Sequence, residues 1–155
     1  METYFLDTSA IVKRYVSFEQ GHAWIVTLCD PTQGHKLYIS QVALVEVVAA
    51  MCRKVREQSI TSGDRDQLIA RFRRDIRSDY DLWRVTTTTY TFAGNLCCSH
   101  KLRAYDAVQL ACALHLRDKA RANQAPAPIF VCADDSLLNI AIEEGLNVEN
   151  PNGYP

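Results

Sequence analysis

Four acidic residues occupy positions from which their side chains could act on one metal ion: Asp7, Glu46, Asp106 and Asp134. Carboxylates that converge on one point repel one another unless a cation lies between them. Oxygen-only ligands at an open edge favour Mg²⁺ or Mn²⁺ over zinc. Such a site suits phosphodiester cleavage, because the metal activates a water and neutralises charge on the transition state. A spare carboxylate would orient that water or act as general base.

The positions of these acids relative to predicted strands place them at one edge of a sheet. Asp7 directly follows the β-prone residues 3–6, and Asp134 follows residues 129–132 after one alanine. In parallel sheets the carboxyl ends of the strands form the edge at which ligands bind. Glu46 lies early in a helix that follows a strand, and it can reach back because helical side chains lean toward the N-terminus. Asp106 opens a helix after a loop, with no strand immediately before it.

Helix capping is an alternative role for each aspartate. Aspartate is a favoured N-cap residue, so Asp7 and Asp134 could simply cap the helices that follow them. Asp106 with Gln109 three residues later resembles a capping box, although Asp replaces Ser or Thr. Both roles remain open for these three residues.

A purely structural role is less favoured for Glu46 than for the aspartates, because Glu46 interrupts an apolar helical stretch. Its neighbours three and four positions away are apolar, and no positive side chain lies within one turn. A buried, unpaired carboxylate costs several kcal/mol or becomes protonated. A metal ion or a specific partner would remove that cost, so we expect a functional role for Glu46.

The elements that must position these acids alternate along the chain. Strands are predicted at residues 3–6, 37–40, 82–85, 129–132 and 147–149, and helices at residues 8–16, 20–29, 41–58, 64–77, 89–100, 105–121 and 135–144. Short β-branched strands that alternate with helices indicate a parallel sheet covered on both faces. We therefore expect one α/β domain over residues 1–155, without a linker or an internal repeat.

Composition narrows the class of protein. A hydrophobic content of 48% can fill a core, no apolar stretch could span a bilayer, and the first residues lack a signal-peptide pattern, so we expect a cytoplasmic protein. The net charge of −1 argues against a general nucleic-acid binder. The six cysteines form no C-x-x-C pair and no zinc-binding spacing with histidine, so buried free thiols in a reducing compartment are expected.

Four segments, in order, resemble PIN domains and especially the toxins of VapBC-type toxin–antitoxin modules. They are YFLDTSA at residues 4–10, SQVALVE at 40–46, LRAYDAVQLA at 102–111 and FVCAD at 130–134. The resemblance implies a three-layer α/β/α sandwich with a central parallel sheet. It also implies a Mg²⁺- or Mn²⁺-dependent ribonuclease. By this likeness Asp7, Glu46, Asp106 and Asp134 are the catalytic acids, and Asp7, Asp106 and Asp134 bind the metal.

The same resemblance adds a supporting residue and raises one departure. Ser9 is expected to support the site. Many members carry Thr or Ser two residues before the last acid, where this chain has Cys132, so a hydroxyl that could orient a ligand or water is missing. Asp135 could therefore share the role of Asp134, although the family pattern favours Asp134.

The partners follow from the likeness as well: an RNA substrate, a small antitoxin and a second copy of the chain in a homodimer. Apolar residues of the early helices, including Trp24, Ile25 and Leu28, exceed what a small sheet needs, so we expect an exposed apolar patch of the kind that marks an interface. Two alternatives remain, an RNA-processing nuclease without an antitoxin and an inactive PIN module that binds RNA. A phosphatase using Asp7 as nucleophile would need a second Asp at position 9, which is Ser.

Overall fold

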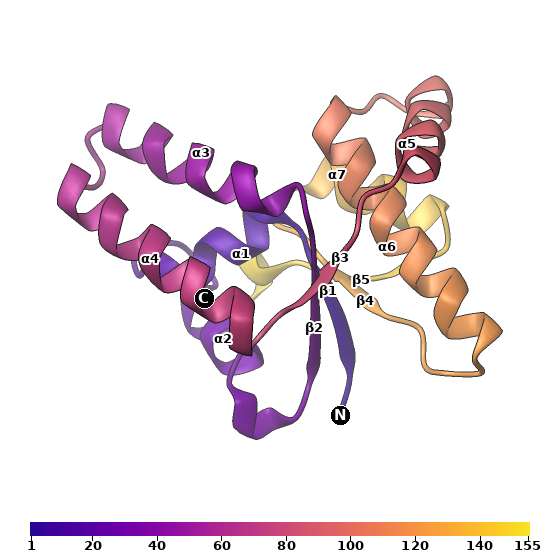
Figure 1. Cartoon of the computed structure of the whole chain (residues 1–155), viewed down its shortest axis with the longest axis horizontal. Helices are drawn as coiled ribbons and strands as arrows, with labels where there is room; N and C mark the ends of the chain where they lie inside the picture. The colour runs from indigo at the N-terminus through magenta and orange to yellow at the C-terminus, as the bar shows by residue number, and fades with distance from the viewer.

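The computed structural model describes residues 1–155 and contains one parallel sheet of five strands in the order β3-β2-β1-β4-β5 (Figure 1). The strands are β1 (Thr3–Leu6), β2 (Lys36–Ser40), β3 (Asp81–Trp83), β4 (Ile129–Val131) and β5 (Asn147–Glu149). All five correspond to strands predicted from the sequence. The first strand made, β1, is the middle strand of the sheet.

Helices connect successive strands, as parallel pairing requires. They are α1 (Thr8–Tyr15), α2 (His22–Leu28), α3 (Ala43–Arg56), α4 (Ser62–Ser78), α5 (Thr87–Ser99), α6 (Ala104–Ala122) and α7 (Asp135–Glu143). Each was predicted, with boundaries that differ by a few residues. Two short 3₁₀ turns, Pro31–Gln33 and Pro151–Gly153, were not predicted; each begins at a proline after an Asp or Asn whose side chain caps it. No helix has the length and apolar character needed to cross a bilayer.

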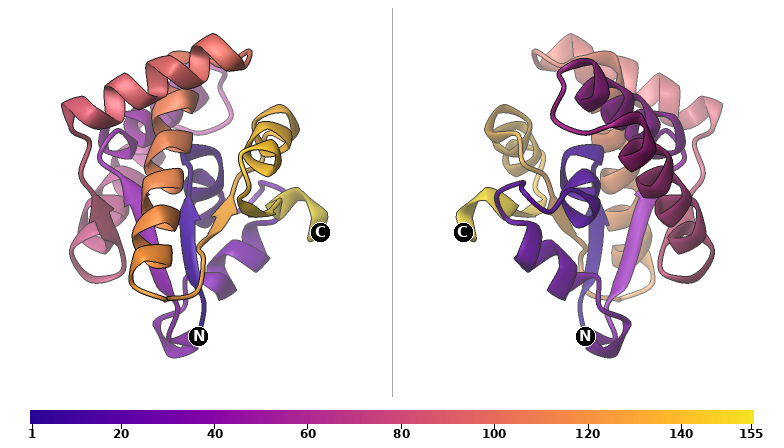
Figure 2. Two further views of the ribbon diagram at one scale, coloured as in Figure 1. Left: turned by 90° about the vertical axis from the view of Figure 1, so that its right-hand side faces the viewer. Right: turned by 90° about the vertical axis from the view of Figure 1, so that its left-hand side faces the viewer.

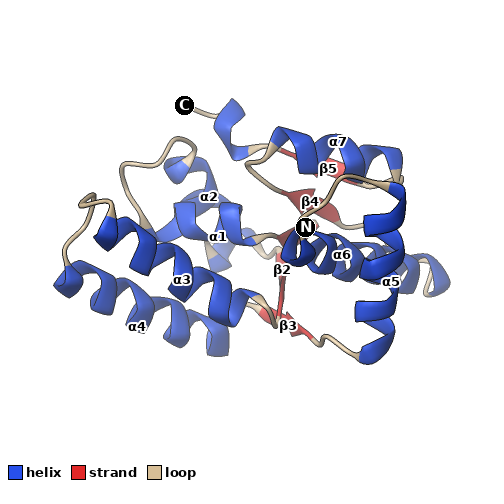
Figure 3. Cartoon of the chain, turned by 90° about the horizontal axis from the view of Figure 1, so that it is seen from above, coloured by secondary structure: helices blue, strands red, loops and turns tan.

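The sheet separates two hydrophobic cores, which gives the expected three-layer α/β/α arrangement (Figure 2). Alternate strand residues point to opposite faces, so Leu6 packs with α1 to α4 while Phe5 packs with α5 to α7. Val131 and Phe130 of β4 divide in the same way. Seen from above, the first four helices lie on one side of the sheet and the last three on the other (Figure 3).

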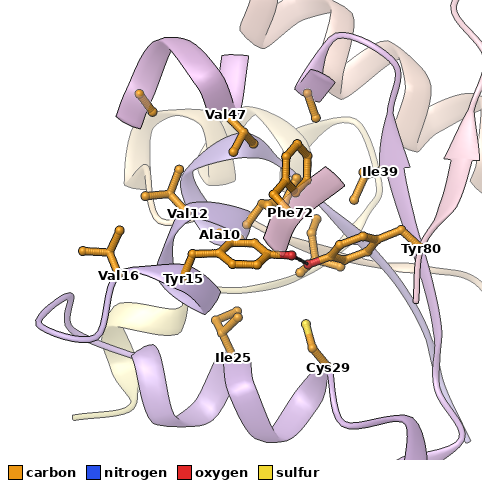
Figure 4. Packing of buried hydrophobic residues seen from close by; sticks show 14 of the residues in the cluster. Ala10, Val12, Tyr15, Val16, Ile25, Cys29, Ile39, Val47, Phe72 and Tyr80 are labelled. Atoms are coloured by element: carbon orange, nitrogen blue, oxygen red, sulfur yellow. Dashed lines mark hydrogen bonds between the residues drawn. The ribbon is translucent and has the colours of Figure 1, made fainter. Parts of the chain in front are cut away.

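A buried polar cluster beside the first core joins α1 to the end of α4. Figure 4 shows its two tyrosines, Tyr15 and Tyr80, among the apolar side chains. The Tyr15 hydroxyl donates to Asp75 Oδ2 at 3.0 Å and lies 3.1 Å from the Tyr80 hydroxyl. The Arg14 guanidinium forms ion pairs with both Asp75 and Asp79. Because buried polar groups without partners are costly, these contacts favour a single position of α4 against α1.

The apolar residues of α2 do not form the exposed patch predicted from the sequence. Ile25 is fully buried, Leu28 is 5% exposed, and the Trp24 ring stacks on Tyr154 at a centroid distance of 4.4 Å. That prediction was wrong because four helices cover this face of the sheet, and the core between them requires more apolar side chains than a single covering layer would.

The loop before α2 makes a close backbone contact that only glycine permits. Gly21 has φ +80°, and a Cβ built there would lie 2.2 Å from the carbonyl oxygen of Pro151. Gly34 has a similar φ of +69° but has nothing within 4 Å of such a Cβ. Comparing alanine substitutions at the two positions therefore separates the free-energy cost of backbone strain from that of a steric clash.

We predict that Gly34→Ala costs about 1 kcal/mol, because an L-residue is disfavoured in the left-handed region. Gly21→Ala should cost about 3 kcal/mol or more, since the clash adds to the same strain. Urea titrations of both variants measure the difference. Equal losses at the two positions would show that the segment at Pro151 moves aside freely.

Candidate active site

The four predicted acids line one cleft of about 620 Å³ at the carboxyl edge of the sheet. Each comes from a different part of the chain: Asp7 from the β1–α1 junction, Glu46 from α3, Asp106 from α6 and Asp134 from the β4–α7 junction. β1 and β4 are neighbours, and the Asp7 amide donates to the Val131 carbonyl at 3.1 Å. The fold therefore brings all four together; we call this cavity the acidic cleft.

Asp7 and Asp134 both cap helices and line the acidic cleft, so the capping role and a role in the site are compatible for these two residues. Asp7 Oδ1 accepts from the Ala10 amide at 3.0 Å. Asp134 Oδ1 accepts from the amides of Ser136 and Leu137 at 2.9 and 3.2 Å. In each residue these bonds end on one oxygen, and the second carboxylate oxygen makes no hydrogen bond within the protein. Capping thus orients each carboxylate and leaves one oxygen available.

Asp106 does not cap its helix. α6 begins at Ala104 with Arg103 as N-cap, which places Asp106 in the third helical position. Its carboxylate has no hydrogen-bond partner in the protein and faces the cleft half-buried. Burial and the nearby charge of Asp134 raise the pKa of Asp106. The capping-box interpretation is therefore wrong, because the helix starts at Ala104, one residue earlier than predicted, and its N-cap is Arg103.

Glu46 has neutral partners where none was predicted. Its Oε1 accepts from Gln109 Nε2 at 2.9 Å and from the Thr8 hydroxyl at 3.2 Å. The same Gln109 amide also donates to Thr8 Oγ1 at 3.0 Å. Burial raises the pKa of Glu46, and these hydrogen bonds lower it. Thr8 and Gln109 are thus site residues that sequence reasoning missed.

Gln109 orients Glu46 and Thr8 through its Nε2, but its own Oε1 is buried without a hydrogen-bond partner. The residue is 1% exposed, and its Oε1 has no hydrogen-bond partner. A buried acceptor left unpaired is unfavourable, so the two bonds made by its Nε2 must compensate. The spacing offered a signal, because Gln109 lies one turn after Asp106 on the same face of α6. The spacing does not show that Gln109 donates a hydrogen bond to Glu46, because that contact depends on how α3 packs against α6.

Ser9, which was expected to support the site, contacts Asp7. Its hydroxyl donates to Asp7 Oδ1 at 2.6 Å and accepts from the Ala133 amide at 2.9 Å, so it ties the two strand ends together. The Cys132 thiol is buried and accepts from the Asp134 amide at 3.3 Å. Asp135 does not line the cleft and instead accepts from Asn150 at 2.8 Å.

Basic side chains also line the acidic cleft, and none of them was assigned to the site from the sequence. Lys13 and Lys54 both form ion pairs with the carboxylate of Glu19, whose single negative charge offsets one of their two positive charges. Arg53 and Arg103 are exposed, line the cleft and form no ion pair. The cleft therefore presents an acidic floor beside two free guanidinium groups.

The donor set has the chemistry of a magnesium site. The wall supplies carboxylate oxygens and contains no histidine or cysteine, which is the ligand type that hard divalent cations prefer. Burial raises the pKa of Asp7 to about 6, and charge repulsion from Asp106 contributes. No three of these side chains lie close enough in this arrangement to hold an ion. The carboxylates thus line the cleft without forming a closed cage.

The fold and the cleft together define an α/β/α protein with an acidic site at the carboxyl edge of its sheet. Residues 4–140 match the family model described as PIN domain, and the chain belongs to this family. A comparison with curated proteins by sequence finds no match.

Solved structures with the same fold include components of toxin–antitoxin complexes. A VapBC2 complex of Rickettsia felis bound to a promoter DNA fragment has a chain with TM-score 0.62 and 14% identity, covering 96% of this chain and 98% of that one. A toxin–antitoxin complex from Klebsiella pneumoniae gives TM-score 0.58 and 15% identity, covering 96% and 97%. FitAcB from Neisseria gonorrhoeae gives TM-score 0.58 and 14% identity, covering 96% and 97%. At these identities the likeness shows the fold alone.

We predict that Asp7→Asn stabilises the metal-free protein at pH 8 and not at pH 4. Asparagine keeps the Oδ1 acceptor that caps α1, but it removes the ionised form that burial penalises. The folded-state pKa of Asp7 is about 6 against an ordinary 3.8. The folded state therefore binds more protons than the unfolded state between these pH values, and the stability of the parent falls as pH rises through that window.

The gain at pH 8 should approach about 3 kcal/mol and fade below pH 4. Denaturant titrations in EDTA at several pH values measure it. Asp81→Asn serves as control, because this aspartate is exposed and has no hydrogen bond or ion pair. A gain that does not change with pH would contradict the assignment of the cost to ionisation of Asp7.

Proposed function

We propose that the protein is a Mg²⁺- or Mn²⁺-dependent endoribonuclease. The observation that carries this proposal is the convergence of four carboxylates, from four separate elements, on one cleft whose rim holds two unpaired arginines. The acids suit a divalent cation, and the arginines suit the phosphates on either side of a scissile bond. Membership of the PIN-domain family supports nuclease chemistry at this site.

The proposed roles follow from the environment of each carboxylate. Asp7, Asp106 and Asp134 would hold the ion, which when bound supplies charge neutralisation at the phosphate and a water of lowered pKa. Asp7 and Asp134 are held in place by their capping bonds, so an oxygen of each stays turned to the same edge. Asp106 has no hydrogen bond in the protein and is free to adjust.

Glu46 suits the role of general base. Gln109 and Thr8 both donate to its Oε1, which fixes the carboxylate and leaves Oε2 to accept a proton from the attacking water. Its raised pKa moves the group toward the range in which a base works near neutral pH. Arg53 and Arg103 would bind the RNA phosphates.

We further propose that the nuclease is the toxin of a type II toxin–antitoxin pair, restrained by a small antitoxin, and that the chain forms a homodimer. Support comes from structures of the same fold, which include a toxin–antitoxin complex from Klebsiella pneumoniae and a VapBC2 complex from Rickettsia felis. Several large apolar side chains also remain exposed, among them Phe18 at 61% and Ile142 at 54%. A partner that covers such side chains would gain the free energy of their burial.

We predict that the pure protein cleaves RNA in Mg²⁺ or Mn²⁺ and stops in EDTA. Asp106→Asn should lower the rate at least about 100-fold, because it removes a ligand charge. Without metal this variant should be as stable as the parent or more stable, since one repelling carboxylate is gone. With Mg²⁺ the melting temperature of the parent should rise more than that of the variant.

Asp135→Asn provides the matched control, because Asp135 is the next acid along from Asp134 and does not line the cleft. It should keep the parent's rate and its response to Mg²⁺. Cleavage that persists in excess EDTA would overturn the metal mechanism, and full activity in Asp106→Asn would remove that residue from the site.

The proposed homodimer is tested by sedimentation, and the proposed antitoxin is tested by its inhibition of RNA cleavage. In sedimentation experiments the isolated chain should form dimers at micromolar concentration. The small protein encoded next to it should bind it and suppress RNA cleavage. A chain that stays monomeric at high concentration and is not inhibited by that neighbour would contradict the toxin assignment while leaving the nuclease assignment in place.

A further inference from the structure

The acidic cleft continues into a second hollow of about 280 Å³ between α3 and the start of α6. We call it the side hollow. Glu46, Arg53 and Tyr105 line both cavities, so the two are continuous. One side of the side hollow is a stripe along α3, formed by Val45, Ala49, Arg53 and Arg56. The other side is the ring of Tyr105, which directly precedes Asp106.

Tyr105 is unusual among the tyrosines of this chain. Five of the seven tyrosines contact another aromatic or histidine ring. Tyr105 is 52% exposed. Its ring has no aromatic partner, and its hydroxyl makes no hydrogen bond within the protein. Tyr90 on α5 is alike in these respects, with 55% exposure, but it lines neither cavity. An unpartnered ring at the mouth of a cavity offers its face to a ligand.

The charges around the side hollow indicate what kind of ligand this is. Arg53 and Arg56 both line it, both are exposed, and neither forms an ion pair. The nearby lysines, by contrast, are bound by Glu19. Two free guanidinium groups beside an exposed aromatic face, on an apolar floor, match a nucleotide, which has anionic phosphates and a flat base.

We propose that the side hollow binds one nucleotide of single-stranded RNA next to the scissile phosphate, with its base stacked on Tyr105 and its phosphates on Arg53 and Arg56. This inference rests on the proposed ribonuclease function and adds to it a subsite for the nucleotide beside the scissile phosphate, formed by Tyr105, Arg53 and Arg56. In a duplex both faces of a base are already stacked, so Tyr105 could engage only a base that lies free of pairing. Stacking would also position the adjoining phosphodiester over the carboxylates.

Binding to a short labelled RNA tests the proposal apart from cleavage. Fluorescence anisotropy is measured in Mg²⁺ with chains that carry Asp106→Asn, so that the probe, a ten-nucleotide strand without self-complementarity, survives. Tyr105→Ala should weaken binding about tenfold, and Tyr105→Phe should restore it because the ring face remains. Tyr105→Leu should bind like the alanine variant. Tyr90→Ala is the matched control and should bind like its parent.

The role of the arginines is tested by measuring the affinity for the same RNA at several salt concentrations. Arg56→Gln should weaken binding and make the dependence of affinity on salt less steep by about one unit of the log–log slope, since one phosphate contact is lost. Arg73→Gln is its control, because Arg73 is exposed, unpaired and outside both cavities. The same strand annealed into a duplex should bind more weakly than the single strand to the parent, and Tyr105→Ala should not change that affinity.

Several results would overturn the subsite. These are an unchanged affinity in Tyr105→Ala, full binding by Tyr105→Leu, equal losses in Tyr105→Ala and Tyr90→Ala, or a duplex that binds as well as the single strand. A change of oligomeric state in Tyr105→Ala, seen by sedimentation, would instead assign the ring to an interface between copies. If the subsite alone fails, the chain with Asp106 intact still cleaves RNA in Mg²⁺; if the ribonuclease function fails, that chain cleaves no RNA.

Discussion

The pairing of β1 with β4 is the contact on which the rest of the site depends. These strands are far apart in sequence, yet Leu6 lies opposite Val131, and the amide of Asp7 continues the ladder one residue beyond the strand. Because the pairing is parallel, both strands end at the same edge of the sheet. A slip of register by one residue would turn Leu6 and Phe5 toward the wrong cores. The division of the two cores thus also aligns the two carboxylates.

The fold keeps like charges close without neutralising them inside the protein. Asp7 and Asp134 gain hydrogen bonds from backbone amides at helix starts, and Glu46 gains them from the neutral side chains of Gln109 and Thr8. The two lysines that line the cleft, Lys13 and Lys54, are both paired with Glu19. Hydrogen bonds lower the cost of burying a carboxylate but leave its charge in place. Burial and the neighbouring charge of Asp106 therefore disfavour the ionised form of Asp7 and raise its pKa.

Most of the fold could be predicted from the sequence, because its elements carry strong local signals. The predicted strands and helices all occur, and Asp7 and Asp134 lie at the carboxyl edge of the sheet as expected. What could not be predicted depends on packing between elements far apart in the chain. The partners of Glu46 come from α1 and α6, and the burial of Ile25 depends on how four helices share one face. The start of α6 was misplaced by one residue, and that error produced the wrong capping role for Asp106.

The strand order also has a consequence for synthesis. β1 is the first strand to leave the ribosome, yet one of its two neighbours, β4, lies near the other end of the chain. A nascent chain that has emerged only as far as α5 contains Asp7 and Glu46 but neither α6 nor β4. It therefore lacks two of the four acids and the strand that aligns them. The acidic cleft forms only after β4 and Asp134 have been translated, so a nascent chain that ends within α5 does not carry an assembled site.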